Sequence, residues 1–128
     1  MREIRQPEGT YQYVFGPFAS PIERVSPGER VAMYTLDAFG DLLTGEDQSV
    51  SSVLGPYLNP QTGPIFIEGA EPGDTLAVKI ISIESTRDWA VSCTIPFFGG
   101  LTSTVWTPSL QPPLEERVWI YRRTSSGG

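Results

Sequence analysis

The chain has 128 residues, a formal net charge of −6 and a pI near 4.5, which argues against nucleic acid as a partner because nucleic-acid-binding domains carry clustered basic residues. It contains no histidine, which excludes Ser-His-Asp and Cys-His catalysis and a His-ligated zinc site built from this chain alone. No apolar run is long enough to cross a membrane and no secretory leader is visible, so we expect a soluble cytoplasmic protein.

Proline, glycine and cysteine usage limits the expected fold. The chain has 13 glycines and 12 prolines, and these residues disfavour long helices. Cys93 is the single cysteine, so no intramolecular disulfide can form, and we expect it to be a buried, inert thiol. The length suits one domain with one core. We therefore expect a single domain over residues 1–123 and a flexible tail at residues 124–128.

After a first strand predicted at residues 11–15, the chain contains two turns of the same kind. The motifs SPGE and EPGD end at Glu29 and Asp74, and in each a proline presets φ while the following glycine takes a positive φ. Such type II turns predict strands that begin near Arg30 and Thr75. Because Glu29 and Asp74 occupy matching places, we expect both to stabilise their turns rather than to act in catalysis.

Between the two turns lies a long polar region, residues 41–58, in which only residues 46–54 predict a short helix. A loop of this length in a compact β domain is usually functional or mobile. Its acidic residues Asp41, Glu46 and Asp47 are interpreted as solvated surface charge, although their oxygens are also of the type that binds hard cations.

The second turn leads into the most apolar segment of the chain, LAVKIIS after Thr75. This segment is apolar on nearly both faces, which predicts a central strand. Lys79, the only lysine, is expected to snorkel or to pair with a carboxylate rather than to act as a buried base. Further strands are predicted at residues 65–68, 89–94 and 117–121, and short strands at this spacing are typical of a sandwich or a barrel.

Four unusual segments occur in a fixed order: FGPF at residues 15–18, LDAFGD at 36–41, NPQTGPIFIEGAEPGDTLAV at 59–78 and PFFGGL at 96–101. In this order and at these spacings they resemble the N-terminal half of the acetamidase/formamidase family. The resemblance implies hydrolysis of small aliphatic amides to ammonia and a carboxylate. It also implies an all-β, jelly-roll-like β-sandwich with one long, partly helical loop, and a divalent metal such as zinc or calcium in some members.

The sequence departs from the family pattern in two ways. Family members are typically more than twice this length, and their second half carries a GDxHxxxGxGE-like segment that this chain lacks. Many members also have a histidine in the region of FGPF, where this sequence has Phe18.

Asp37 and Glu68 are the candidate catalytic residues. Asp37 ends the first turn-led strand and either holds a metal ion or orients a water, or else caps an Asx-type turn. Glu68 ends a short apolar strand before Gly69, either at the edge of a cleft with a raised pKa suited to proton transfer or as an ordinary strand-end glutamate. The family pattern favours the functional alternative for Glu68.

Four further residues are candidates for substrate binding: Phe18, Phe98, Gly99 and Gly100. The two glycines would let backbone N–H groups approach a ligand closely, as an oxyanion site requires. A simple turn with aromatic packing is the alternative for this segment.

Two hypotheses about function follow from these observations. In the first, the chain is part of an amidohydrolase that is incomplete, and inactive, without a second-half subunit or a second copy of itself. In the second, it is a non-catalytic binding or structural module that retains the scaffold, and a fragment of a longer enzyme is a further alternative. In every case we expect association through exposed apolar residues, with Trp106, Leu110, Leu114 and Trp119 as the candidates.

Overall fold

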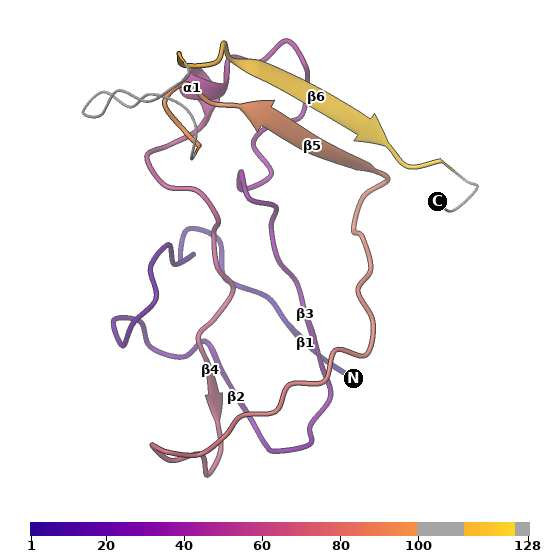
Figure 1. Cartoon of the computed structure of the whole chain (residues 1–128). Helices are drawn as coiled ribbons and strands as arrows, with labels where there is room; N and C mark the ends of the chain where they lie inside the picture. Colours follow the sequence, from indigo (N-terminus) through magenta and orange to yellow (C-terminus); the bar gives the residue numbers. More distant parts are fainter. Residues whose placement is uncertain (100–111, 125–128) are drawn as a thin grey trace. The chain divides into compact units, whose positions relative to one another are not determined.

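The computed structural model describes residues 1–99 and 112–124, and within these ranges it is mostly strands and coil with very little helix. The sequence-based expectation of a β-rich chain is therefore confirmed, whereas the jelly-roll sandwich and the single domain over residues 1–123 stay predictions. The elements in chain order are β1 (Arg2–Ile4), β2 (Glu23–Val25), β3 (Val31–Met33), α1 (Val50–Val53), β4 (Ile65–Ile67), β5 (Trp89–Thr94) and β6 (Arg117–Arg122), as Figure 1 shows.

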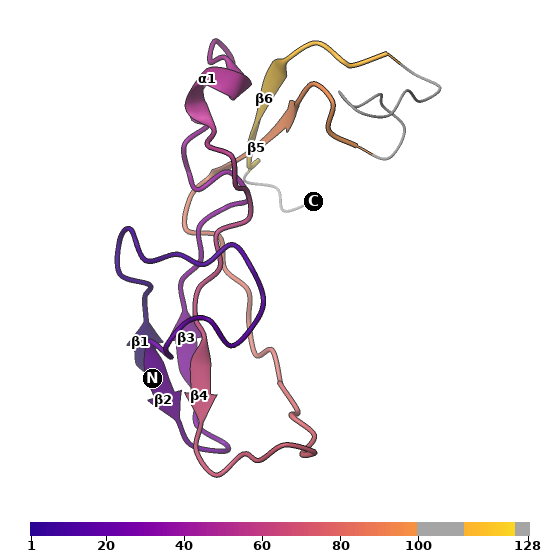
Figure 2. The same cartoon turned by 90° about the vertical axis from the view of Figure 1, so that its left-hand side faces the viewer.

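The chain divides into two compact units, and the first comprises Met1–Gly40 and Tyr57–Ile83. In this unit β1 pairs with β3 and β2 pairs with β4, both in parallel, and Figure 2 shows each pair side by side. An isolated antiparallel bridge joins Gln12 to Gln61. Ile4 is the buried apolar side chain of this unit in the described residues. Two-stranded sheets of this length are marginal by themselves, so we expect this unit to gain stability from further packing.

The second unit comprises Asp41–Pro56 and Glu84–Gly128, and its main feature is the antiparallel pair β5 and β6. The register runs from Trp89 opposite Arg122 to Thr94 opposite Arg117. Three apolar side chains of this unit are buried in the described part: Leu43, Val50 and Val118. The core of each unit is therefore small.

Several local predictions are confirmed. The turn-led strand expected near Arg30 is β3, and the strands expected at residues 65–68, 89–94 and 117–121 are β4, β5 and β6. The short helix expected within residues 46–54 is α1. At residues 11–15, where a strand was expected, the structure has only the bridge at Gln12. Among the described residues no helix is both long and apolar enough to span a bilayer.

The predicted central strand after Thr75 is wrong for this chain by itself. Residues 75–83 form no strand, and every one of them is exposed. A strand requires a neighbour to pair with its backbone, and none of the described segments lies in hydrogen-bonding register with residues 75–83. The apolar pattern that predicted a buried strand is present, but within residues 1–99 and 112–124 no segment covers it.

The amount of exposed surface agrees with the small cores. The accessible surface of the chain is 10208 Å², whereas a compact monomer of 14.1 kDa exposes about 6,700 Å² by the usual scaling with mass. The chain therefore leaves more of its surface uncovered than a folded monomer of its mass does.

Candidate functional site

Asp37 lies just after β3 and its carboxylate caps a turn. Its Oδ1 accepts a hydrogen bond from the backbone N–H of Phe39 at 2.8 Å, and its carbonyl oxygen accepts one from the N–H of Gly40 at 3.1 Å. This is the Asx-type arrangement, in which a short acidic side chain mimics a backbone turn. The turn-capping alternative is thus observed, and any catalytic or metal-binding role of Asp37 would be additional to it.

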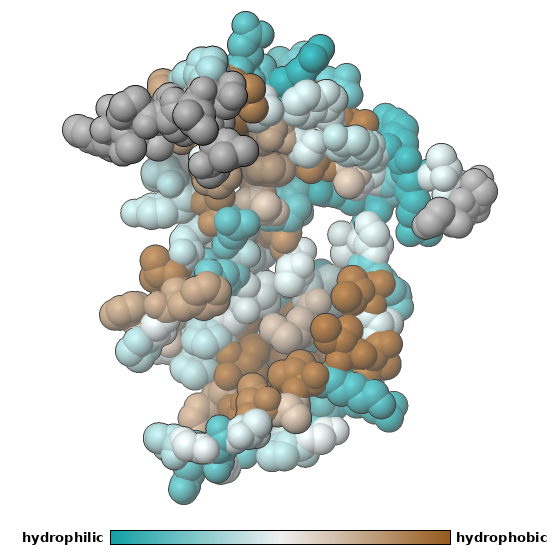
Figure 3. All heavy atoms as spheres, viewed as in Figure 1, coloured by the Kyte–Doolittle hydropathy of each residue, from teal (hydrophilic) through white to brown (hydrophobic). Residues whose placement is uncertain are grey.

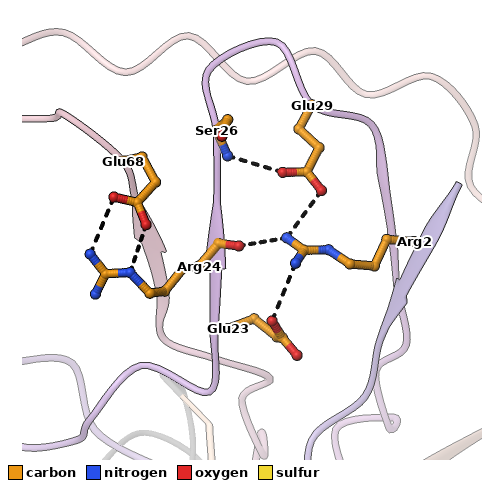
Figure 4. Close-up of polar contacts among 6 residues, drawn as sticks. All are labelled: Arg2, Glu23, Arg24, Ser26, Glu29 and Glu68. Atoms are coloured by element: carbon orange, nitrogen blue, oxygen red, sulfur yellow. Dashed lines mark hydrogen bonds and ion pairs between the residues drawn. The ribbon is translucent and has the colours of Figure 1, made fainter.

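Glu68 follows β4 and is held by an arginine from β2. The Arg24 Nε lies 2.6 Å from Glu68 Oε1 and the Arg24 Nη2 lies 3.2 Å from Oε2, which is a bidentate ion pair (Figure 4). The Glu68 backbone N–H also donates to the carbonyl oxygen of Val25 at 2.8 Å. Parallel pairing of β2 with β4 places Arg24 opposite Phe66, and the guanidinium carbon of Arg24 lies 3.7 Å from the centre of the Phe66 ring.

This pairing determines the charge of Glu68. The hydrogen bond from Arg24 lowers the pKa of the Glu68 carboxyl from its ordinary value of 4.5, and it raises the pKa of Arg24. The prediction of a raised Glu68 pKa is therefore wrong. The carboxyl is not desolvated in an apolar pocket: 45% of the side chain is exposed, and its partner stabilises the charged form. At neutral pH Glu68 is a carboxylate, suited to accept rather than to donate a proton.

A second arginine, Arg2 of β1, fixes the backbone around this ion pair. Its Nη2 donates to the carbonyl oxygen of Arg24 at 2.5 Å and lies 3.1 Å from Glu29 Oε1, while its Nη1 lies 3.5 Å from Glu23 Oε2 (Figure 4). Arg2 therefore connects the N-terminal strand to β2 and to the first of the two repeated turns. The position of Arg24, and through it that of Glu68, depends on this cluster of charges.

The two repeated turns have the same structure, as predicted. The N–H of Glu29 donates to Ser26 O at 3.0 Å and the N–H of Asp74 donates to Glu71 O at 3.1 Å. In each turn the acidic side chain also accepts a bond from the first residue, Ser26 N to Glu29 Oε2 at 3.0 Å and Glu71 N to Asp74 Oδ2 at 2.9 Å. Glu29 and Asp74 thus stabilise turns.

The candidate substrate-binding residues are exposed where the structure describes them. Phe18 in the first unit and Phe98 in the second both expose most of their side chain. The N–H of Phe98 donates to the carbonyl oxygen of Ile95 at 3.2 Å, and Gly99 has a φ of 130°, so this segment forms a turn. Gly100 lies outside the described residues.

The acidic loop residues are used within the second unit. Asp41 Oδ1 lies 3.0 Å from Arg87 Nη1, and Glu46 Oε1 accepts a bond from the backbone N–H of Ile120 at 3.1 Å. Across the described ranges no group of three or more His, Cys, Asp or Glu side chains is placed to hold a metal ion. The residues described here therefore do not form a divalent-metal site by themselves.

The remaining candidates are structural. Cys93, which was expected to be buried, is half-buried on β5, and burial, followed by the nearby Glu116 carboxylate, raises the pKa of its thiol and so favours the protonated form. Lys79 is exposed within residues 75–83 rather than buried in a strand. Of the apolar residues expected to associate, Leu114 is exposed and Trp119 half-buried, while Trp106 and Leu110 lie outside the described ranges.

Comparison with known proteins identifies the family. The model of the acetamidase/formamidase family matches residues 3–122, nearly the whole chain. The chain belongs to the acetamidase/formamidase family. No curated protein matched the sequence.

Two solved acetamidases resemble this family member in structure. The acetamidase from Yersinia enterocolitica is 41% identical, with a TM-score of 0.78 over 90% of this chain and 36% of its own. The acetamidase from Bacillus halodurans is 24% identical, with a TM-score of 0.62 over 94% of this chain and 37% of its own, and this likeness shows the fold alone. The chain thus spans little more than a third of the acetamidases that it matches.

Sequence reasoning missed Arg24 and Arg2, the residues that hold Glu68. Arg24 lies two positions before the start of the first SPGE turn and is separated from Glu68 by 44 positions. The only local signal was the alternation of side chains along β2. This strand has three residues, which are too few for a periodic pattern to be recognised.

Proposed function

We propose that this chain is part of an amidohydrolase that cleaves small aliphatic amides into ammonia and a carboxylate. The observation that carries the proposal is the match of the acetamidase/formamidase family model to residues 3–122. The 41% identity to the Yersinia acetamidase supports the same chemistry. In the complete enzyme we expect the short strands to join a jelly-roll-like β-sandwich.

The active site is proposed to need groups that the chain lacks. Amide hydrolysis requires polarisation of the carbonyl, activation of a water or a nucleophile, and a proton for the leaving nitrogen. Glu68 is proposed to accept the proton of the attacking water, because it is an unprotonated carboxylate at neutral pH. Its pairing with Arg24 lowers its pKa and so makes it a weaker base than an unpaired glutamate. The proton donor is proposed to come from a second-half polypeptide or from a second copy.

The other candidate site residues are proposed to orient and contact the substrate. Although Oδ1 of Asp37 accepts a bond within its own turn, we propose that the Asp37 carboxylate also holds a metal ion or orients a water in the complete site. Phe18, which is exposed in the first unit, is proposed to contact the apolar part of the substrate. In the second unit the exposed Phe98 is proposed to do the same, and the N–H groups of Gly99 and Gly100 are proposed to bind the carbonyl oxygen of the amide.

A non-catalytic module is the second candidate function. The observation in its favour is that both candidate carboxylates already have structural partners, Asp37 in its turn and Glu68 in its ion pair with Arg24. The chain also has no histidine. In this case the family scaffold would be retained for binding or assembly without turnover.

The deciding experiment is ammonia release from acetamide and formamide. The chain is assayed by itself and after co-expression with the part of the Yersinia acetamidase that lies outside the matched 36%. We expect no turnover by the chain alone and measurable turnover by the pair. Enzyme-like turnover by the purified chain alone would contradict incompleteness, and an inactive, properly assembled pair would favour the module.

In the active pair, Glu68→Gln is expected to reduce turnover by about 10²- to 10⁴-fold, because it removes the proton acceptor. Asp37→Asn retains an oxygen to cap the turn and removes only the negative charge, so a loss of activity in this variant would show that turnover needs the charge of Asp37. Glu71→Gln is the matched control, since this nearby glutamate contributes only its backbone N–H and C=O groups to the turn. Equal activity of Glu68→Gln and the control would exclude Glu68 as the base.

A further inference from the structure

Residues 75–83 carry the largest exposed apolar run in the described part of the molecule. The exposed fractions of their side chains are 64% for Leu76, 77% for Val78, 70% for Ile80, 62% for Ile81 and 86% for Ile83. Figure 3 shows apolar side chains gathering over the segment that follows β4. The apolar side chains occupy alternate positions and, at Ile80 and Ile81, successive ones, so an extended chain presents them on both of its faces.

The backbone of this segment is also unpaired. Within the described ranges, no hydrogen bond joins the main chain of residues 75–83 to another segment, and Figure 1 shows the segment as a coil between β4 and β5. Proteins normally protect a free edge with charges, prolines or bulges. Here Lys79 is the single charged residue and no proline is present. The segment therefore lacks the features of a strand that stays exposed.

The start of the segment is fixed. The EPGD turn ends at Asp74, whose N–H donates to Glu71 O at 3.1 Å and whose Oδ2 accepts from Glu71 N at 2.9 Å. These two bonds set the direction in which the chain leaves the turn, so Thr75 and the residues after it begin from a defined position. Such preorganisation reduces the entropy that a partner would have to remove on pairing.

We propose that residues 75–83 are a docking strand, and that its occupant is the amidase polypeptide corresponding to the part of the acetamidases that this chain does not match. This inference rests on the proposed function in so far as it takes the complete enzyme to contain that polypeptide. The occupant supplies extended segments whose N–H and C=O groups pair with the backbone of residues 75–83. It also supplies apolar side chains that cover both faces of the docking strand. Main-chain bonds give the affinity, as in other cases of strand addition.

The length of the similar proteins argues for this occupant over a second copy of the chain. This chain covers only 36% of the Yersinia acetamidase, so most of that protein is available to cover the docking strand. Two copies paired through residues 75–83 would satisfy one edge of each strand and leave the other edge bare. Each copy also carries a net charge of −6, which opposes self-association.

The test is hydrogen exchange followed by mass spectrometry on the full chain, by itself and co-expressed with the unmatched part of the Yersinia acetamidase. In the chain alone we expect the amides of residues 75–83 to exchange as in an unprotected peptide. In the co-purified pair we expect them to be slowed by at least about 100-fold, as in a paired strand. Fast exchange at these amides in a stable pair would overturn the proposal, and so would failure of the two polypeptides to co-purify.

Two substitutions test the apolar faces with a matched control. Val78→Asp places a charge in the docking strand and is expected to weaken the pair by about 30-fold or more, the effect of losing an interface hot spot. Val14→Asp changes the same residue type at an exposed position outside the strand and is expected to leave the affinity within about threefold. Equal effects of the two substitutions would overturn the assignment of residues 75–83.

Proline substitutions identify the edge that is occupied. Neighbouring residues of an extended chain direct their N–H groups to opposite edges, so Val78→Pro and Lys79→Pro each remove a donor from a different edge. Weakening by one of them indicates pairing on one edge, and weakening by both indicates pairing on both edges. Undiminished affinity in both variants would overturn pairing through the backbone.

The outcomes separate this inference from the proposed function. Protection of residues 75–83 without ammonia release would support docking and count against the amidase. Ammonia release without protection would support the amidase and overturn docking. Protection of these residues in the chain alone, together with a dimeric mass by light scattering, would identify a second copy as the occupant and overturn the one proposed.

Discussion

At the scale of single residues, the main finding is that Glu68 has a defined partner. Arg24 binds both carboxylate oxygens, and Arg2 holds the carbonyl group of Arg24 in turn. Both members of the ion pair are well exposed, so the pair contributes little to stability and its effect is on the charge and orientation of Glu68. A base for amide hydrolysis needs both of these properties.

Replacing Arg24 should therefore change the titration of Glu68. We expect Arg24→Gln to raise the Glu68 pKa toward its ordinary value of 4.5, and Arg24→Lys to give an intermediate value because it retains the charge but loses the bidentate geometry. The measurement is the carboxyl ¹³C chemical shift of Glu68 against pH, with Arg122→Gln as the control in the other unit. A Glu68 titration that is the same in all variants would show that the ion pair does not form in solution.

The sign of the pH dependence follows from the lowered pKa. A group whose pKa is lower in the folded chain stabilises the fold above its unfolded pKa, and it loses this contribution as the pH falls through the folded value. The unmodified chain should thus exceed Arg24→Gln slightly in stability above pH 4.5, and this difference should vanish in more acidic solution.

At the scale of elements, local signals predicted well and long-range ones did not. The SPGE and EPGD turns and the strands β3, β5 and β6 were foreseen, because turn chemistry and short apolar runs act over a few residues, whereas the pairing of β5 with β6 was not. The parallel pairing of β2 with β4 was not foreseen, because it joins residues about forty positions apart through strands of three residues. Residues 75–83 were misassigned because their apolar pattern is typical of a buried strand, and the described part of the chain does not bury them.

In the candidate site too, local signals predicted well and long-range ones did not. Sequence reasoning selected Asp37 and Glu68 from their places at strand ends, and it gave Glu29 and Asp74 their role in turns. The environment of Glu68 could not be predicted, because it depends on Arg24 and Arg2, which come from two other strands. A pKa depends on such neighbours, and they become known only once the strands are paired.

The EPGD turn gives a prediction at this scale. Gly73 has a φ of 103° and Gly55 has a φ outside the left-handed region, while an added Cβ would meet nothing within 4 Å at either position. Gly73→Ala is therefore expected to cost about 1–2 kcal/mol through backbone strain alone, whereas Gly55→Ala should be neutral or slightly stabilising. Urea unfolding checks this. Equal effects of the two alanines would mean that the turn relaxes to another conformation.

At the scale of the whole molecule, few apolar side chains of the described residues are buried. Four apolar side chains are buried in the described residues, Ile4, Leu43, Val50 and Val118, which is a small core for 128 residues. Hydrophobic stabilisation scales with the apolar area removed from water. A chain that buries so little should depend on a partner for much of its stability.

This dependence predicts a low sensitivity to denaturant. An unfolded chain of 14.1 kDa exposes about 20,400 Å², and unfolding from the observed 10208 Å² exposes only about three-quarters of the area that a compact protein of this mass exposes. Because the m-value is proportional to that area, we expect an m-value for the chain alone of about three-quarters of the compact value. Urea titration followed by tryptophan fluorescence gives the m-value.

In the co-expressed pair, the unfolding transition of this chain should sharpen and shift to higher urea concentration as its apolar surface is covered. A full, compact-protein m-value for the chain alone would mean that it buries its apolar surface without a partner, and the case for a second polypeptide would then rest on the length of the family alone.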